Sequence, residues 1–212
     1  MKLVDLTLPI PELQNTRPTV RTDLVPLVCA DAPCQARVHH FRHDSMVGTY
    51  LDFPGHLVET DDGATAANDP PERFYRVRAA VVRLHRQSGS GGISAQELQA
   101  AAPPLEGCGA LIINALGTIR FDAILYRSVF LNRDAVEWII STPIHLLVSD
   151  VYESKALSEG VFPLLFSRRI CTVCQPVNLH CLEQPYTRLT VLTPRFPKAT
   201  QLPCRAVAEV AS

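Results

Sequence analysis

The chain has 212 residues, of which 47% are hydrophobic and 19% are charged, and this is enough apolar material for one sizeable core. Lys and Arg total 20 against 21 Asp and Glu, so the formal net charge is −1. A chain so nearly neutral has no global attraction to nucleic acid or to an anionic membrane, and we expect neither as a partner.

The N-terminal segment has neither a long apolar run nor a small-residue cleavage site, so it does not resemble a secretory signal peptide. No apolar stretch approaches the roughly 20 residues that a membrane-spanning helix needs. We therefore expect a cytoplasmic protein in which the seven cysteines are reduced thiols. Cys171 and Cys174 form a lone CxxC without the second pair that a structural zinc site needs, which favours buried thiols over a ligand pair.

Taken in chain order, alternating apolar and polar residues first predict a strand over 2–10. Residues 12–37 hold several prolines and little periodicity, so we expect irregular chain or a long excursion there, with a short strand over 36–41. Glycines and a proline between 45 and 57 favour a tight functional loop over a regular element.

The rest of the chain alternates strand and helix patterns. Ser94, with Glu97 three residues later, forms a capping box for a helix over 95–101, and a one-sided apolar pattern predicts a second helix from 132 or 133 through 140. Strands are expected at 77–84, 110–115, 145–148, 170–174, 189–192 and 203–210. This alternation predicts an α/β fold, a single domain over 1–212 with a mixed β-sheet or barrel-like core flanked by helices.

The stretch most informative about function runs from Met46 to His56. Asp52 and His56 lie four residues apart with Pro-Gly between them, so both can face one pocket. Asp52 could fix the tautomer of His56, which could then act as a general base because its unperturbed pKa is near neutrality. Gly48 permits a close backbone approach, so nearby amides could stabilise an oxyanion. In the alternative, neither residue has a catalytic role: Asp52 caps a turn and His56 is a packed side chain.

This stretch resembles the loop H-x-G-T-H-x-D-x-P-x-H of the cyclase family that includes the bacterial kynurenine formamidases. The matching residues are Gly48, Thr49, Asp52, Pro54 and His56. The opening residues 4–7, the predicted strand that ends at Asp150 and the closing residues 203–208 are also similar to the family's. The resemblance implies a swivelling β/α fold, a homodimer or homotetramer, and hydrolysis of C–N or C–O bonds at a two-metal centre.

The metal ligands of this family are largely missing from the sequence. Its two other loop histidines are replaced by Met46 and Tyr50, no histidine lies in 161–165, and Cys174 or Gln175 stands where a glutamate is usual. A thioether and a neutral phenol are poor ligands for zinc or manganese, and catalytic zinc needs about three protein ligands. The resemblance thus implies a divergent member with no metal and no cofactor. A mononuclear zinc or manganese site rebuilt from other histidines and cysteines stays open.

The chemistry that survives is acid–base catalysis. We expect a small-molecule enzyme of specialised metabolism, a metal-independent cyclase, lyase or hydrolase that cyclises, dehydrates or hydrolyses a carbonyl substrate such as a lactone or amide. Two alternatives remain, a non-catalytic binding or subunit-pairing relative and a rewired mononuclear metal-dependent amide or ester hydrolase. The predicted catalytic residues are His56, Asp52 and Tyr50, and the predicted substrate-binding residues are Gly48, Thr49, Met46 and Phe53.

Overall fold

A single curled sheet dominates the structure, a computed structural model that describes residues 2–10, 13–14, 17–18, 20–27, 34–86 and 89–210. Its central parallel strands are β7 (Val77–Arg83), β9 (Ala110–Asn114), β11 (Leu146–Ser149) and β12 (Cys171–Cys174). The antiparallel flanks are β1 (Lys2–Asp5), β15 (Arg205–Val210) and β13 (Tyr186–Leu192) on one side, and β6 (Tyr50–Asp52) and β14 (Gln201–Pro203) on the other. The strand order is β1-β15-β13-β7-β9-β11-β12-β6-β14, which confirms the predicted mixed sheet.

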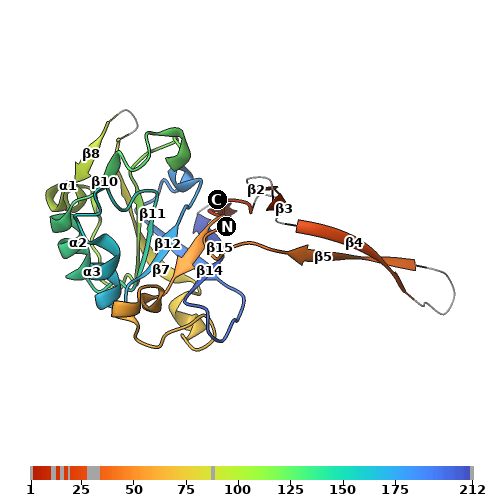
Figure 1. Ribbon diagram of the computed structural model, residues 1–212. Helices are drawn as coiled ribbons and strands as arrows, with labels where there is room; N and C mark the ends of the chain where they lie inside the picture. The colour runs from red at the N-terminus through yellow and green to blue at the C-terminus, as the bar shows by residue number, and fades with distance from the viewer. Residues whose placement is uncertain are drawn as a thin grey trace.

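Three short α-helices cover one face of the sheet (Figure 1). They are α1 (Ala95–Ala101), α2 (Arg133–Ile140) and α3 (Val161–Ser167). The predicted cap of α1 is confirmed, because the Ser94 side chain accepts a hydrogen bond from the Glu97 N–H at 3.2 Å. The Glu97 carboxylate, however, pairs with Arg86. Within the described ranges, no helix is both long and apolar enough to cross a membrane.

Several shorter elements complete the body. A parallel pair joins β8 (Gly91–Ile93) to β10 (Val129–Leu131), and a small hairpin joins β2 (Leu13–Gln14) to β3 (Arg17–Pro18). Turns of 3-10 helix lie at Pro54–His56, Val58–Thr60, Pro71–Arg73, Phe121–Ala123 and Leu179–Cys181.

The sheet separates two apolar layers. Leu98, Ile139 and Leu165 of the helices are fully buried on one face, and Leu6 and Val173 are fully buried in the layer on the other. Each such side chain contributes about 1.5–3 kcal/mol when it is fully removed from water. Both faces of the parallel strands are therefore covered, which explains why they are almost continuously apolar in sequence.

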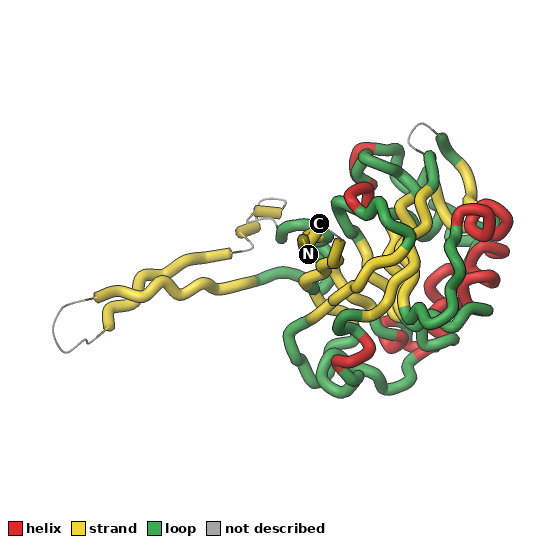
Figure 2. The backbone as a smooth tube through the Cα atoms, turned by 180° about the vertical axis from the view of Figure 1, so that it is seen from behind, coloured by secondary structure: helices red, strands yellow, loops and turns green. Residues whose placement is uncertain are grey.

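A long hairpin extends away from this body, as Figures 1 and 2 show from opposite sides. It pairs β4 (Val20–Leu27) with β5 (Cys34–Phe41), and we call these two strands the arm. The prediction of irregular chain over 12–37 is wrong for the arm strands, and residues 28–33 lie outside the described residues. Pro26 argued against a strand in the sequence. Both strands of a two-stranded ribbon are edge strands, however, and edge strands tolerate proline.

Other sequence predictions shift in their bounds or need correction. The first strand ends at Asp5, because from Leu6 onward the backbone bonds to the loop that carries Thr49 and to the closing strand. Part of the expected loop over 45–57 is the strand β6. The expectation that all cysteines are reduced thiols is wrong for Cys34, which is disulfide-bonded. Cys34 begins a strand of the arm, where no core is present to bury a free thiol. The described free cysteines are Cys108, Cys171, Cys174, Cys181 and Cys204.

Candidate active site

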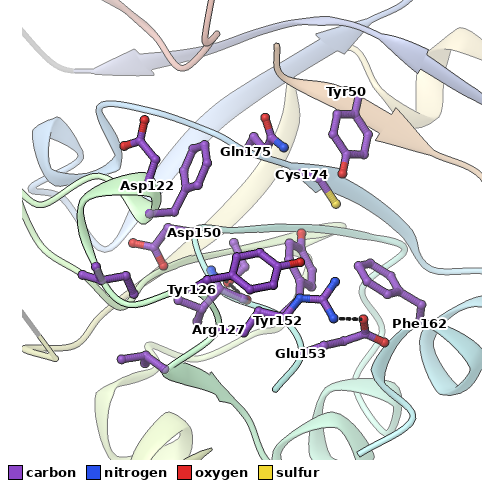
Figure 3. A pocket seen from close by; sticks show the side chains of 15 residues that line it. Tyr50, Asp122, Tyr126, Arg127, Asp150, Tyr152, Glu153, Phe162, Cys174 and Gln175 are labelled. Atoms are coloured by element: carbon purple, nitrogen blue, oxygen red, sulfur yellow. Dashed lines mark hydrogen bonds and ion pairs between the residues drawn. The ribbon is translucent and has the colours of Figure 1, made fainter. Parts of the chain in front are cut away.

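A pocket of about 420 Å³ opens where β11 and β12 end (Figure 3). The carboxyl ends of neighbouring parallel strands meet at one edge of a sheet, and this edge is where open α/β sheets bind ligands. Residues 149–153 leave β11, Cys174 and Gln175 end β12, and Tyr50 begins β6. Aromatic side chains line much of the remaining wall, namely Phe121, Tyr126, Tyr152 and Phe162.

Tyr50 lines this pocket and faces Cys174 (Figure 3). The two residues are cross-strand partners of β6 and β12. Burial, and then the nearby Cys174 and Asp52, raise the pKa of Tyr50 far above its ordinary value. Tyr50 is therefore a neutral phenol near neutral pH and can donate a hydrogen bond to a bound molecule.

Asp52, two residues along β6 from Tyr50, is not among the residues that line the pocket, and 2% of its surface is exposed. Its Oδ1 accepts a hydrogen bond from Gln201 Nε2 at 2.6 Å. Its Oδ2 accepts from the Thr172 hydroxyl at 3.3 Å and from the Cys174 thiol at 3.4 Å. Burial still raises the pKa of Asp52, against the opposing effect of these donors and of His56. Because Cys174 lines the pocket beside Tyr50 and bonds to Asp52, it links the pocket to the buried carboxylate.

The predicted pair of Asp52 and His56 is joined through a third residue. Gln201 Nε2, which donates to Asp52, also lies 3.3 Å from His56 Nε2. The other end of the amide is fixed, since Gln201 Oε1 accepts from the Ser45 hydroxyl at 2.5 Å. The amide must therefore donate to both neighbours, which assigns the hydrogen of a neutral His56 to Nδ1. Like Asp52, His56 is not among the residues that line the pocket.

None of the four residues predicted to bind substrate lines this pocket. Gly48 has φ +62°, and a Cβ there would lie 2.7 Å from the Leu8 carbonyl oxygen, so it serves a close backbone approach. The Thr49 hydroxyl accepts from the Leu8 N–H at 2.7 Å and donates to the Gln175 carbonyl at 2.8 Å. Met46 is 55% exposed, and Phe53 is buried.

We expect Phe53→Leu to destabilise the protein without changing its affinity for substrate. The Phe53 ring is 2% exposed and packs edge-on against Phe74, with the ring centroids 5.8 Å apart. Losing this packing should cost about 1 kcal/mol of unfolding free energy. Urea denaturation measures the loss, and an unchanged KM separates a core residue from a binding residue. A large rise in KM would instead mean that Phe53 binds substrate, as the sequence predicts.

Sequence reasoning missed the charged pair in the pocket wall. Arg127 lies 3.5 Å from Glu153, and its guanidinium lies over the Tyr126 ring at 5.1 Å (Figure 3). Burial raises the pKa of Glu153, while Arg127 opposes the rise. Arg127 and Gln175 both have positive φ, 54° and 56°, a strained conformation that is enriched at functional sites. The only sequence signal for Glu153 is that an acid follows soon after a buried strand, and no pattern indicates Arg127.

Asp150 also lines the pocket and ties two loops together. Its Oδ1 accepts from the Ala115 N–H at 2.9 Å, and its Oδ2 accepts from the Leu116 N–H at 3.0 Å. Burial raises the pKa of Asp150 to about 6, even though these two bonds favour the carboxylate. The carboxylate therefore holds the loop after β9 against the loop after β11.

The donor set at the family's ligand positions does not fit a two-metal centre. Across the described residues, no three His, Cys, Asp or Glu side chains gather where they could hold a metal ion. Both oxygens of Asp52 already accept hydrogen bonds from neutral donors. Burial and Asp52 raise the pKa of Cys174, which keeps it a thiol, whereas a metal binds the thiolate. At the other two positions, Met46 is exposed and Tyr50 stays protonated.

Solved structures with the same fold are found at low sequence identity. A predicted metal-dependent hydrolase from Bacillus stearothermophilus has a TM-score of 0.68 at 17% identity, over 98% of this chain and 97% of that one. Isatin hydrolase A from Labrenzia aggregata, bound to benzyl benzoate, gives 0.71 at 15% identity over 98% and 93%. Isatin hydrolase A from Ralstonia solanacearum gives 0.67 at 18% identity over 98% and 91%. These likenesses confirm the predicted fold.

No curated protein sequence matches the chain significantly. A family model described as "Putative cyclase" does match it, over residues 4–154, the region that contains the Met46–His56 stretch and Asp150. The match confirms the family resemblance drawn from that stretch. With the hydrolase folds it supports a small-molecule cyclase or hydrolase. This chain belongs to the cyclase family.

Proposed function

We propose that this chain is an enzyme that performs acid–base chemistry on a small carbonyl substrate in the pocket of Figure 3, without the family's two-metal centre. The reaction is a cyclisation, a dehydration or the hydrolysis of a lactone or amide. One observation carries the proposal: Tyr50, at a ligand position of the family motif, lines the pocket beside Cys174, whose thiol donates a hydrogen bond to the buried Asp52. The structural neighbours named isatin hydrolase support hydrolysis as one direction.

Tyr50 has the role of polarising the substrate. Its raised pKa keeps the hydroxyl protonated, so it donates a hydrogen bond to the carbonyl oxygen and stabilises the negative charge that develops there. Such a donor acts most strongly where water is excluded, and the aromatic wall of the pocket supports that exclusion.

Glu153 is the proton acceptor in this proposal. Burial raises its pKa toward neutrality, which makes the carboxylate a stronger base, and Arg127 keeps it ionised and oriented. Glu153 takes a proton from the attacking hydroxyl or water, or from the substrate carbon, and returns it to the leaving group. Asp52 and His56 act through Cys174 and Gln201, so they are positioning residues that hold the Cys174 side of the pocket, which Tyr50 faces.

The experiment is an assay of lactones and N-formyl amides with protein purified without a metal-affinity tag, before and after chelation. We expect hydrolysis, or the reverse cyclisation, to survive chelation, with no stoichiometric zinc or manganese by plasma mass spectrometry. Adding each metal back to the chelated protein is the control for incomplete removal. The physical reason is that the Asp52 oxygens are already occupied and Cys174 is a thiol.

Two results would contradict the proposal. Stoichiometric metal with activity lost on chelation would point to a rewired mononuclear hydrolase. Folded protein that turns over no member of the panel, yet binds some of them, would point to a non-catalytic binding relative.

A further inference from the structure

The charged side chains of the pocket leave one carboxylate without a counter-ion. Asp122 pairs with Arg120 at the surface. Glu153 has Arg127 as its partner within the pocket wall, at 3.5 Å. Asp150 forms no ion pair with a described residue, and burial and backbone N–H groups set its pKa without a contribution from a charged side chain. With a pKa of about 6, Asp150 is mostly ionised at neutral pH, so the pocket carries a negative charge that its described residues do not balance.

A buried acceptor beside Asp150 also lacks a hydrogen-bond partner. β9 and β11 pair Ile112 with Val148, and both side chains belong to the same apolar layer. Two residues further along each strand, the alternation of side chains brings Asn114 and Asp150 to that same face of the sheet. Asn114 is 2% exposed, and its Oδ1 receives no hydrogen bond from a described residue. An unused carbonyl oxygen therefore lies next to the unbalanced carboxylate.

Aromatic rings in the pocket wall add to the attraction for a positive group. Tyr126 already holds one cation, because the Arg127 guanidinium lies 5.1 Å from the centroid of its ring. Tyr152 and Phe162 stack in the same wall, with their ring centroids 5.2 Å apart. The face of an aromatic ring attracts a cation that lies within about 6 Å of its centroid. A cation inside the pocket is thus attracted by the rings as well as by Asp150.

Arg127 does not make the pocket a site for anions. Its guanidinium already contacts Glu153, the Ser154 carbonyl oxygen at 3.5 Å and the Tyr126 ring. An anion placed on Arg127 would compete with Glu153 and would also lie in the field of Asp150. Like charges repel most strongly where water is excluded, so the wall disfavours an anionic ligand.

We propose that the substrate of this pocket carries a cationic amine, an ammonium group that Asp150 holds against the aromatic wall (Figure 3). An ammonium group offers only hydrogen-bond donors, so it suits a carboxylate that lies beside the unused acceptor of Asn114. In the proposed reaction the carbonyl of this amine faces Tyr50, and Glu153 remains the proton acceptor. The inference rests on the proposed function in one respect, that this pocket is where the substrate binds.

Isothermal titration calorimetry with three probes of similar size tests the charge preference. Benzylammonium, benzyl alcohol and benzoate share a phenyl ring and differ in charge. Near neutral pH we expect benzylammonium to bind about tenfold more tightly than benzyl alcohol, and benzoate to bind most weakly.

The variant Asp150→Asn shows whether Asp150 is the source of the preference. Benzylammonium should lose about tenfold in affinity and benzyl alcohol should be nearly unaffected, which removes the preference. Comparing two probes within one variant cancels any general damage to the loops that Asp150 ties together. Asp122→Asn is the matched control, the same change at a pocket residue that Arg120 already balances, and it should keep the preference.

Three results would overturn the inference. They are binding of benzyl alcohol or benzoate as tight as that of benzylammonium, no detectable binding of benzylammonium at millimolar concentration, and a cation preference that survives Asp150→Asn. These measurements need no turnover, so their failure is distinct from failure of the proposed function. Cation-selective binding without turnover of any lactone or amide would support the inference and contradict the proposed function, whereas turnover without cation preference would do the opposite.

Discussion

Tyr50→Phe is expected to lower kcat/KM on the carbonyl substrate by about 10²- to 10³-fold, the usual effect of removing one oxyanion donor. Tyr50 and Cys174 line the pocket, whereas Asp52 does not, and the Tyr50 hydroxyl is the better hydrogen-bond donor of the two. Removing it leaves the ring in place, so the loss should lie mainly in kcat, with little change in KM. Steady-state kinetics on any substrate identified in the panel measures it.

The matched control for Tyr50→Phe is Tyr75→Phe, the same change on a side chain that is 60% exposed. It should leave kcat/KM unaltered. If the Tyr50→Phe variant is folded and keeps full activity, then Tyr50 only fills the space of the family's metal-binding histidine. The acid–base mechanism built on its hydroxyl would then be wrong.

Asp150→Asn is expected to destabilise the protein in a way that depends on pH. The folded-state pKa of Asp150 is about 6, above the ordinary 3.8, so burial disfavours the charged form. The stability that the protonated group contributes is present below pH 3.8 and is lost as the pH rises through 6. The uncharged amide of the variant has no such loss. The loss of unfolding free energy caused by Asp150→Asn should therefore be smaller at pH 7 than at pH 4, by on the order of 2 kcal/mol.

Denaturant unfolding of both proteins across this pH range measures the difference. Asp122→Asn is the matched control, because Asp122 is half exposed and pairs with Arg120 at the surface. A cost that is constant with pH would mean that Asp150 has an ordinary pKa and acts only through its bonds to the Ala115 and Leu116 N–H groups.

Patterning predicted the body of the fold well, because the physical signals there are local. The buried strands β7, β9, β11 and β12 are short apolar runs, and α1 has an N-cap that depends only on Ser94 and its neighbours. The helix α3 was missed, since its apolar residues and Pro163 show no helical pattern. In the arm, the expected strand over 36–41 matches most of β5, but β4 was missed because its side chains face solvent on both sides and no core imposes a pattern on them.

The candidate site was harder to predict because contacts distant in sequence build it. The family motif includes the position of Tyr50, which lines the pocket, but nothing near Gln201 indicates that it bridges Asp52 and His56. That bridge follows from the register of β14 on β6, which pairs Gln201 with Asp52. Arg127 reaches the pocket from an irregular segment with a left-handed backbone, which composition cannot reveal.

The pairing of β1 with β15, and of β6 with β14, has a consequence for how the chain matures on the ribosome. Strands formed early must wait for partners that emerge after almost all of the described chain has been made. Until then Asp52 lacks its Gln201 donor, and the sheet has open edges on both flanks. Such long-range closure is intrinsically slow and leaves strand edges exposed to aggregation. The site around Asp52 should therefore form only once β14 and β15 have paired, and chaperones that shield nascent sheets should raise the yield of folded protein.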